Sequence, residues 1–165
     1  MSLNKGQVWT TDFIVGFLIF AVGAILVSRM IMNSMADNNF LEVKRESEKI
    51  SEYLMSEGVP ENWTNNTIVR AGLLSYDRLD TRKLSEFQNL TYEDSQLYLG
   101  TAYDYQLLFR KENETLNISR CGYGAASMNN CTLNLSEVEY DDLVKTTRLV
   151  LYNHSIIKMV VYVWG

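Results

Sequence analysis

The chain has 165 residues, a formal net charge of −5 and 47% hydrophobic residues, which leaves room for one domain, or for one domain with an anchor. These averages exclude long disorder, collagen-like repeats and a protein with several membrane spans. An acidic chain without a basic stripe is a poor nucleic-acid binder, so we expect no nucleic acid among its partners.

The first long feature is an apolar segment near the amino terminus. Phe13–Val27 contains no charge, and the apolar span extends to Met32 with Arg29 near its far end. About 20 such residues cross a bilayer as a helix, and Arg29 can snorkel to the interface. Lys5 precedes the span, so the positive-inside rule places everything after Met32 outside the cell. We therefore expect a single-pass cell-membrane protein with membrane lipid as a partner.

Two other interpretations of this segment remain open at this stage. One is a buried core helix, although such helices are seldom apolar on every face over this length. The other is a cleaved secretory signal, with Ser34-Met35-Ala36 as a small-x-small cleavage pattern. Arg29 before that pattern and Asp12 before the apolar stretch argue against a cleaved signal.

The first 13 residues, MSLNKGQVWTTDF, carry a resemblance to a known family. They resemble the class III signal peptide of archaeal type IV pilin-like proteins, in which a prepilin peptidase cuts after a basic-Gly pair and the apolar helix stays on the mature protein. The resemblance implies prepilin peptidase as a partner and a processing site formed by Lys5, Gly6 and Gln7. It also implies an assembly role for Asp12, opposite the terminal amine of a neighbouring subunit. Asp12 is the sixth residue from Gln7, whereas the family usually carries Glu at the fifth. Without that amine, Asp12 is an interfacial acid favoured by the helix dipole.

The residues after the span predict an amphipathic stalk helix. Residues 36–57 contain neither proline nor glycine, and Gly58 with Pro60 forms a stop signal. One face repeats at three- and four-residue spacing, through Phe40, Val43, Ser47, Ile50 and Leu54. The run NSMADNN at 33–39 has low helix propensity and leaves open a break between two helices.

The domain organisation that we expect has four segments: a leader at 1–6, a transmembrane helix at 7–35, an extracellular stalk helix at 36–58 and an extracellular head at 59–165. The fold class is α+β, with the long N-terminal transmembrane and stalk helix packed on a small antiparallel-sheet head of pilin-like type. A head of this size is expected to use the stalk helix for its core.

Short elements are predicted along the head. Asp80–Leu90 reads as a helix, and Thr91 to Asp94 resembles a capping box that opens a helix ending at Gly100. Another helix is expected from Ser136 to about Lys145. Four strands are expected as two hairpins: Ala102–Arg110 with Leu116–Arg120, and Thr147–Tyr152 with Ile156–Trp164.

Potential N-glycosylation sites are strongly enriched. By chance about two of the 14 asparagines would have Ser or Thr two positions on, but eight do. They are Asn62, Asn65, Asn89, Asn113, Asn117, Asn130, Asn134 and Asn153. N-x-S/T is the acceptor for N-linked glycans on exported surfaces, so the pattern predicts an extracellular glycoprotein. The alternative is a polar, loop-rich protein with coincidental sequons.

The two cysteines fit the same compartment. Cys121 and Cys131 flank a segment rich in small and polar residues, and outside the cell we expect them to form a disulfide. Closing a loop of this length would stabilise the fold by roughly 3 kcal/mol. Two unrelated free thiols are the alternative.

Motifs for catalysis are scarce. The chain has no Gly-rich phosphate loop, HExxH pair or nucleophile elbow, and its one histidine, His154, falls in a predicted turn. The acidic run Glu137–Asp142 lacks the spacing of a calcium loop and reads as a solvated helix face. We expect no enzyme, no metal and no cofactor.

The function that we expect is therefore structural. The chain reads as a type IV pilin-like cell-surface glycoprotein, a structural subunit or accessory component of a surface filament or membrane complex. Its partners would be copies of itself or other pilin-like subunits. The alternative is a monomeric, membrane-anchored or secreted extracellular binding protein.

Overall fold

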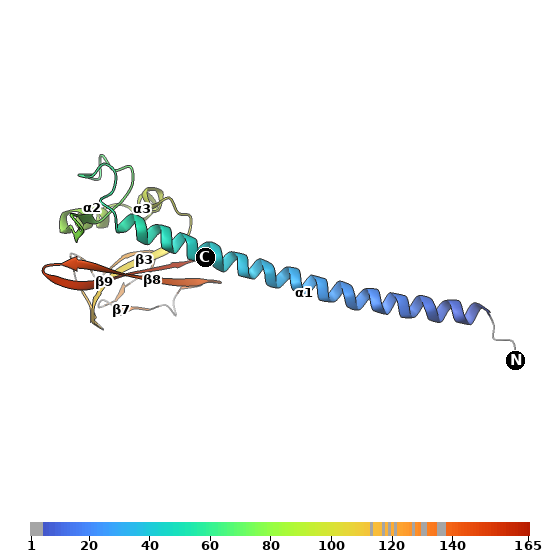
Figure 1. Cartoon of the computed structure of the whole chain (residues 1–165). Coiled ribbons are helices and arrows are strands. Elements are labelled where there is room, and N and C mark those ends of the chain that lie inside the picture. Colours follow the sequence, from blue (N-terminus) through green and yellow to red (C-terminus); the bar gives the residue numbers. More distant parts are fainter. Residues whose placement is uncertain are drawn as a thin grey trace. The chain divides into compact units, whose positions relative to one another are not determined.

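The computed structural model describes residues 5–112, 114–116, 118, 120, 122–126, 128–129, 132–134 and 138–165. The chain divides into two compact units, Met1–Asn39 and Phe40–Gly165 (Figure 1). Helix α1 (Lys5–Leu54, 50 residues) contributes to both units.

The first unit holds the apolar part of α1. Thr11–Met32 spans 22 residues with a mean hydropathy of 2.4, and none of its most apolar window is buried. Within the described residues it is the one helix long and apolar enough to cross a membrane. The backbone remains helical through residues 33–39, so the long continuous helix is found and the alternative of two helices with a break there is wrong. The low-propensity residues cost at most about 0.7 kcal/mol each, which does not end a helix that continues into a packed segment.

The second unit contains a seven-stranded sheet and two short helices, α2 (Thr81–Gln88) and α3 (Tyr92–Leu99). The sheet order is β1-β2-β8-β9-β3-β4, with β5 on the edge of β3. The strands are β1 (Leu74–Ser75), β2 (Arg78–Leu79), β3 (Asp104–Lys111), β4 (Glu114–Thr115), β5 (Gly122–Gly124), β8 (Leu143–Tyr152) and β9 (Ser155–Trp164). A separate two-stranded sheet pairs β6 (Met128–Asn129) with β7 (Thr132–Leu133).

The α+β class is confirmed, but the sheet is mixed rather than antiparallel. Strand β2 runs parallel to β8, where Arg78 pairs with Leu151. The β1–β2 hairpin that brings β2 there turns at Tyr76 and Asp77, which have φ of 50° and 60°. Such turns usually carry Asn-Gly or Asp-Gly, so no local sequence pattern predicts this hairpin.

Both short helices in the second unit are confirmed, and their caps explain their limits. The Asp80 side chain accepts hydrogen bonds from the backbone N–H groups of Arg82 and Lys83 at the start of α2. The Thr91 hydroxyl accepts one from Asp94 at the start of α3, and Gly100 ends α3 in the left-handed conformation. Thr91 and Gly100 are the caps that the sequence predicts for α3, whereas Asp80 was predicted only as the first residue of its helix.

The carboxy-terminal hairpin is also confirmed, and β8 is longer than expected. The helix predicted from Ser136 is wrong: residues 138–142 are not helical, and β8 begins at Leu143 opposite Trp164. Of the strand predicted at Leu116–Arg120, the described residues Leu116, Ile118 and Arg120 belong to no strand of the sheet, and residues 117 and 119 lie outside the described residues. There β3 pairs instead with β4 and β5, and an Ile118–Arg120 bridge is isolated from the sheet.

The sheet has two different faces because side chains alternate along each strand. The inner face packs against the last turns of α1, and α2 and α3 lie on this same side (Figure 1). Four of the five predicted stripe residues of α1 are fully buried there, whereas Phe40 is exposed. On the outer face, a smaller cluster joins Leu108, Val160, Tyr162 and Trp164 beneath Ala126 and Val138.

Candidate functional site

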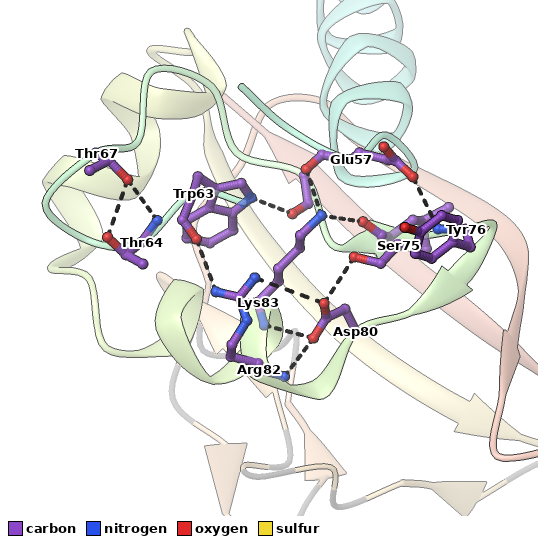
Figure 2. Close-up of polar contacts among 11 residues, drawn as sticks. Glu57, Trp63, Thr64, Thr67, Ser75, Tyr76, Asp80, Arg82 and Lys83 are labelled. Atoms are coloured by element: carbon purple, nitrogen blue, oxygen red, sulfur yellow. Dashed lines mark hydrogen bonds and ion pairs between the residues drawn. The ribbon is translucent and has the colours of Figure 1, made fainter. Parts of the chain in front are cut away.

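The most concentrated polar cluster of the second unit surrounds Lys83 on α2 (Figure 2). The Lys83 side chain is fully buried. Its ammonium donates to the backbone carbonyl oxygens of Glu57 at 2.9 Å and Leu74 at 2.6 Å. A buried cation needs such partners because desolvation otherwise opposes its charge. Lys83 therefore ties α2 to the end of α1 and to β1.

The surroundings of Lys83 shift two pKa values. Burial lowers the pKa of Lys83, and the charges of Asp80 and Glu57 oppose that shift only in part. For Asp80, burial alone would raise the pKa. Hydrogen bonds from Ser75 and from the backbone N–H groups of Lys83 and Arg82, with the Arg82 charge, hold it below its ordinary value. Both groups are thus occupied by contacts within the fold.

A tryptophan closes the same cluster from the loop after α1. The indole nitrogen of Trp63 donates to the Gly72 carbonyl oxygen at 2.9 Å, and Arg82 donates to the Trp63 carbonyl oxygen at 3.1 Å. At Gly72 a Cβ atom would lie 2.5 Å from the Ser56 carbonyl oxygen and 2.7 Å from the Gly58 Cα atom. The loop, α1, β1 and α2 are therefore locked together, and the chemistry of the cluster is structural.

This cluster was not predicted from the sequence. The available signal was position: Lys83 lies four residues before Phe87, on the face of α2 that also buries Leu84. A lysine at that position of an amphipathic helix is normally expected at the border between the buried and exposed faces. Only the tertiary structure shows that the carbonyl oxygens of Glu57 and Leu74 lie within hydrogen-bonding distance of its ammonium.

The described sequons differ in accessibility. Four of their asparagines are exposed, namely Asn62, Asn89, Asn134 and Asn153. Asn65 is half-buried, and with its amide nitrogen turned toward Glu86 it donates to Oε2 at 3.0 Å and to the carbonyl oxygen at 2.8 Å. The remaining predicted acceptors, Asn113, Asn117 and Asn130, lie outside the described residues. The Asn65 amide is therefore engaged by Glu86, and a glycan on this nitrogen would replace one of the two hydrogens that it can donate.

The other predicted site residues are spread along the chain. Lys5, Gly6 and Gln7 form the first turn of α1 in the first unit, and Asp12 is exposed on the same helix. Cys121 and Cys131, the predicted disulfide, lie outside the described residues. His154 is exposed at the β8–β9 turn with φ of 64°.

An open pocket lies on the outer face of the sheet, at the end where β8 begins. Its volume is about 270 Å³, slightly below the roughly 300–1,000 Å³ of small-molecule sites. It is lined by Asp104, Ala125, Ala126, Val138, Glu139 and Trp164, with Asn134 beside them. We call this the acidic pocket. Across the described residues, no group of three or more His, Cys, Asp or Glu side chains is arranged to hold a metal ion.

The chain matches no known protein family, no curated protein and no solved structure. The class is therefore defined by the molecule itself: an α+β domain that follows an apolar helix long enough to cross a membrane.

Proposed function

We propose that this protein is a membrane-anchored cell-surface glycoprotein of the archaeal type IV pilin-like class. The amino-terminal helix is held in lipid and then in an assembly of similar helices, and the second unit stands outside the cell. Its work is structural, as a subunit or accessory component of a filament or membrane complex.

The observation that carries this proposal is the contrast between the two units. In the first unit, nearly all side chains of Thr11–Met32 are exposed. The second unit, in contrast, closes a core around Ile50, Leu54 and Trp63 without them. Leaving a 22-residue span of mean hydropathy 2.4 in water is very unfavourable, so this segment requires lipid or other apolar helices around it.

Two sequence features support the outward orientation and the pilin-like class. All eight sequons follow residue 60, and Lys5 precedes the apolar segment, which favours an exported second unit. The Lys5-Gly6-Gln7 junction resembles a prepilin peptidase site and leaves the apolar helix on the mature chain.

The decisive experiment is intact-mass measurement and amino-terminal sequencing of the protein from its native membranes. We expect a mature chain that begins at Gln7, and we expect Gly6→Val to block this cleavage. Lys44→Glu, a change on the exposed surface of the second unit, is the control and should be processed normally.

Other amino termini would refute parts of the proposal. A chain that begins at Asp37 would be a secreted, soluble protein, and an intact Met1 would indicate an unprocessed signal anchor. Electron microscopy of cells with and without the protein then tests the structural role, because a monomeric binding protein would leave surface filaments unchanged.

A further inference from the structure

The outer face of the sheet carries two surfaces of opposite character at its two ends. At the end near the β8–β9 turn, the register places side chains of β2, β8, β9 and β3 next to one another. In one row Leu151 lies between Arg78 and Ile156, and in the next row Lys158 lies between Leu149 and Arg110. We call Arg78, Arg110, Leu149, Ile156 and Lys158 the tip patch.

The tip patch is both apolar and basic. Leu149 is 63% exposed and Ile156 is 69% exposed. The three cations lie in the same two rows as these aliphatic side chains, and none of the described residues paired in these rows is acidic. Asp77 and Glu112 lie in the adjoining turns. In a chain of net charge −5, such a concentration of positive charge beside exposed aliphatic groups is characteristic of a contact surface.

The acidic pocket at the other end of the same face is complementary. Its lining includes Ala125, Ala126, Val138 and the buried Trp164, with the exposed acid Glu139 beside them. Asp104 is a second acidic lining residue, and its Oδ1 accepts a hydrogen bond from the Tyr92 hydroxyl at 2.8 Å. Asp141 adds an exposed acid two residues beyond Glu139. The pocket can therefore bury an aliphatic side chain of the tip patch against its apolar residues, while its acids lie opposite the cations of that patch.

We propose that the tip patch of one copy docks into the acidic pocket of the next copy, with Leu149 or Ile156 in the pocket. This inference rests on the proposed function, since it names the surface through which the exported units associate. We favour a second copy over a small molecule as the occupant of the pocket. The pocket is small, and the surface that complements it, the tip patch, belongs to the same chain.

The positions of the two surfaces specify the kind of assembly. Six residues of β8 separate Leu149 from Leu143 beside the pocket, which is about 20 Å at ~3.3 Å per residue. Both surfaces lie on the outer face of the sheet. Two copies therefore make the contact when their outer faces oppose, their β8 strands run in the same direction, and one copy is displaced along the strands by about 20 Å. Each copy then keeps one tip patch and one pocket free, and the contact propagates as an open chain rather than closing as a pair.

The test is photo-crosslinking of the full chain in its own membranes, with a photo-reactive amino acid in place of Leu149. The photo-reactive residue is placed in the parent chain and, in parallel, in a Ser136→Ala/Ser155→Ala chain, which lacks the sequons of Asn134 at the pocket and of Asn153 in the β8–β9 turn. A crosslink that forms only without these sequons overturns the inference. We expect crosslinks to peptides containing Glu139 of another copy, and a ladder of products larger than a dimer.

Charge reversal provides the second arm. The tip variant Arg78→Glu/Lys158→Glu and the pocket variant Glu139→Lys/Asp141→Lys should each lose at least 90% of the crosslink. Co-expression of the two variants should restore it, because each then meets its complement. Lys44→Glu/Arg45→Glu makes the same charge change at exposed positions of α1 and should crosslink like the parent.

The remaining outcomes overturn the inference. Crosslinks to another segment of a second copy, to lipid, or to a product that stops at a dimer would do so. If the crosslink fails while native gels still show self-association, only this interface is wrong. If neither is seen, the assembly role proposed above fails with it.

Discussion

The hydroxyl groups of Ser47 on α1 and Thr146 on β8 lie 2.6 Å apart. Ser47 is the one polar member of an otherwise apolar helix stripe, and it is fully buried. Its partner on the sheet explains why a serine is tolerated there, since an unpaired buried hydroxyl would destabilise the fold. One turn further on, Arg148 donates to the Ser51 hydroxyl at 3.2 Å, so α1 is positioned on β8 by polar contacts as well as by apolar packing.

This pair predicts a measurable coupling. Ser47→Ala and Thr146→Val should each lower the free energy of unfolding of the second unit by about 1 kcal/mol. The double variant should lose less than the sum, with a coupling of about 0.5–1 kcal/mol. Urea unfolding of the four proteins measures this cycle. Strict additivity would show that the two hydroxyls do not share a hydrogen bond.

Lys83 provides the largest expected effect of a polar substitution. Lys83→Met keeps the length of the side chain but leaves the carbonyl oxygens of Glu57 and Leu74 without this donor. The free energy of unfolding should fall by about 2–4 kcal/mol. Lys44→Met, on the exposed surface of α1, is the matched control and should change it by less than about 0.5 kcal/mol. Equal effects of the two substitutions would contradict a structural role for the buried ammonium.

Gly72 is required by the close approach of two backbone segments. In Gly72→Ala the new methyl group would collide with the backbone of Ser56 and Gly58, and the loss of stability should be about 1–3 kcal/mol or more. Thermal unfolding measures it. Gly23→Ala, where no atom lies within 4 Å of the new methyl group, should leave the melting of the second unit unchanged. A stable Gly72→Ala variant would mean that the loop and α1 are farther apart than described.

Buried tyrosines predict loss of stability in alkali. Burial raises the pKa of Tyr92 and Tyr105 far above the ordinary value of 10.0, and burial also raises that of Tyr123. The folded state therefore keeps protons that the unfolded state releases. Stability from this source is complete below pH 10 and decreases as the pH rises above it.

Urea unfolding between pH 8 and pH 11 tests the tyrosine prediction. Tyr105→Phe should reduce the slope of stability against pH above 10, although it also removes the hydrogen bond to Ser95 and lowers stability at every pH. Tyr76→Phe, at an exposed turn, should leave the slope unchanged. A parent protein with constant stability over this range would refute the assignment.

Local signals accounted for much of the fold. The caps at Asp80, Thr91 and Gly100 are short-range hydrogen-bonding devices, so their residues identify the helix ends directly. The β-branched and aromatic run of β9 identified the final strand in the same way. In contrast, the β2–β8 pairing joins residues more than 70 positions apart through Arg78 and Leu151, and no local pattern encodes such a contact.

Longer-range packing also determined the secondary structure where the local helix preference of the sequence was misleading. The acidic residues after Ser136 favour a helix start, but pairing of Leu143 with Trp164 extends β8 into that region. Propensity differences of a few tenths of a kcal/mol are smaller than the gain from a continuous antiparallel ladder.

The sequence by itself determined the apolar helix, the placement of every sequon beyond residue 60 and the α+β class, because composition, short motifs and periodicity are local properties of a chain. Only the tertiary structure decided which face of the sheet is covered, that Lys83 is buried, and that the tip patch and the acidic pocket share one outer face. Those properties depend on strand register and order, and these are fixed by the closing of the whole core rather than by any single segment.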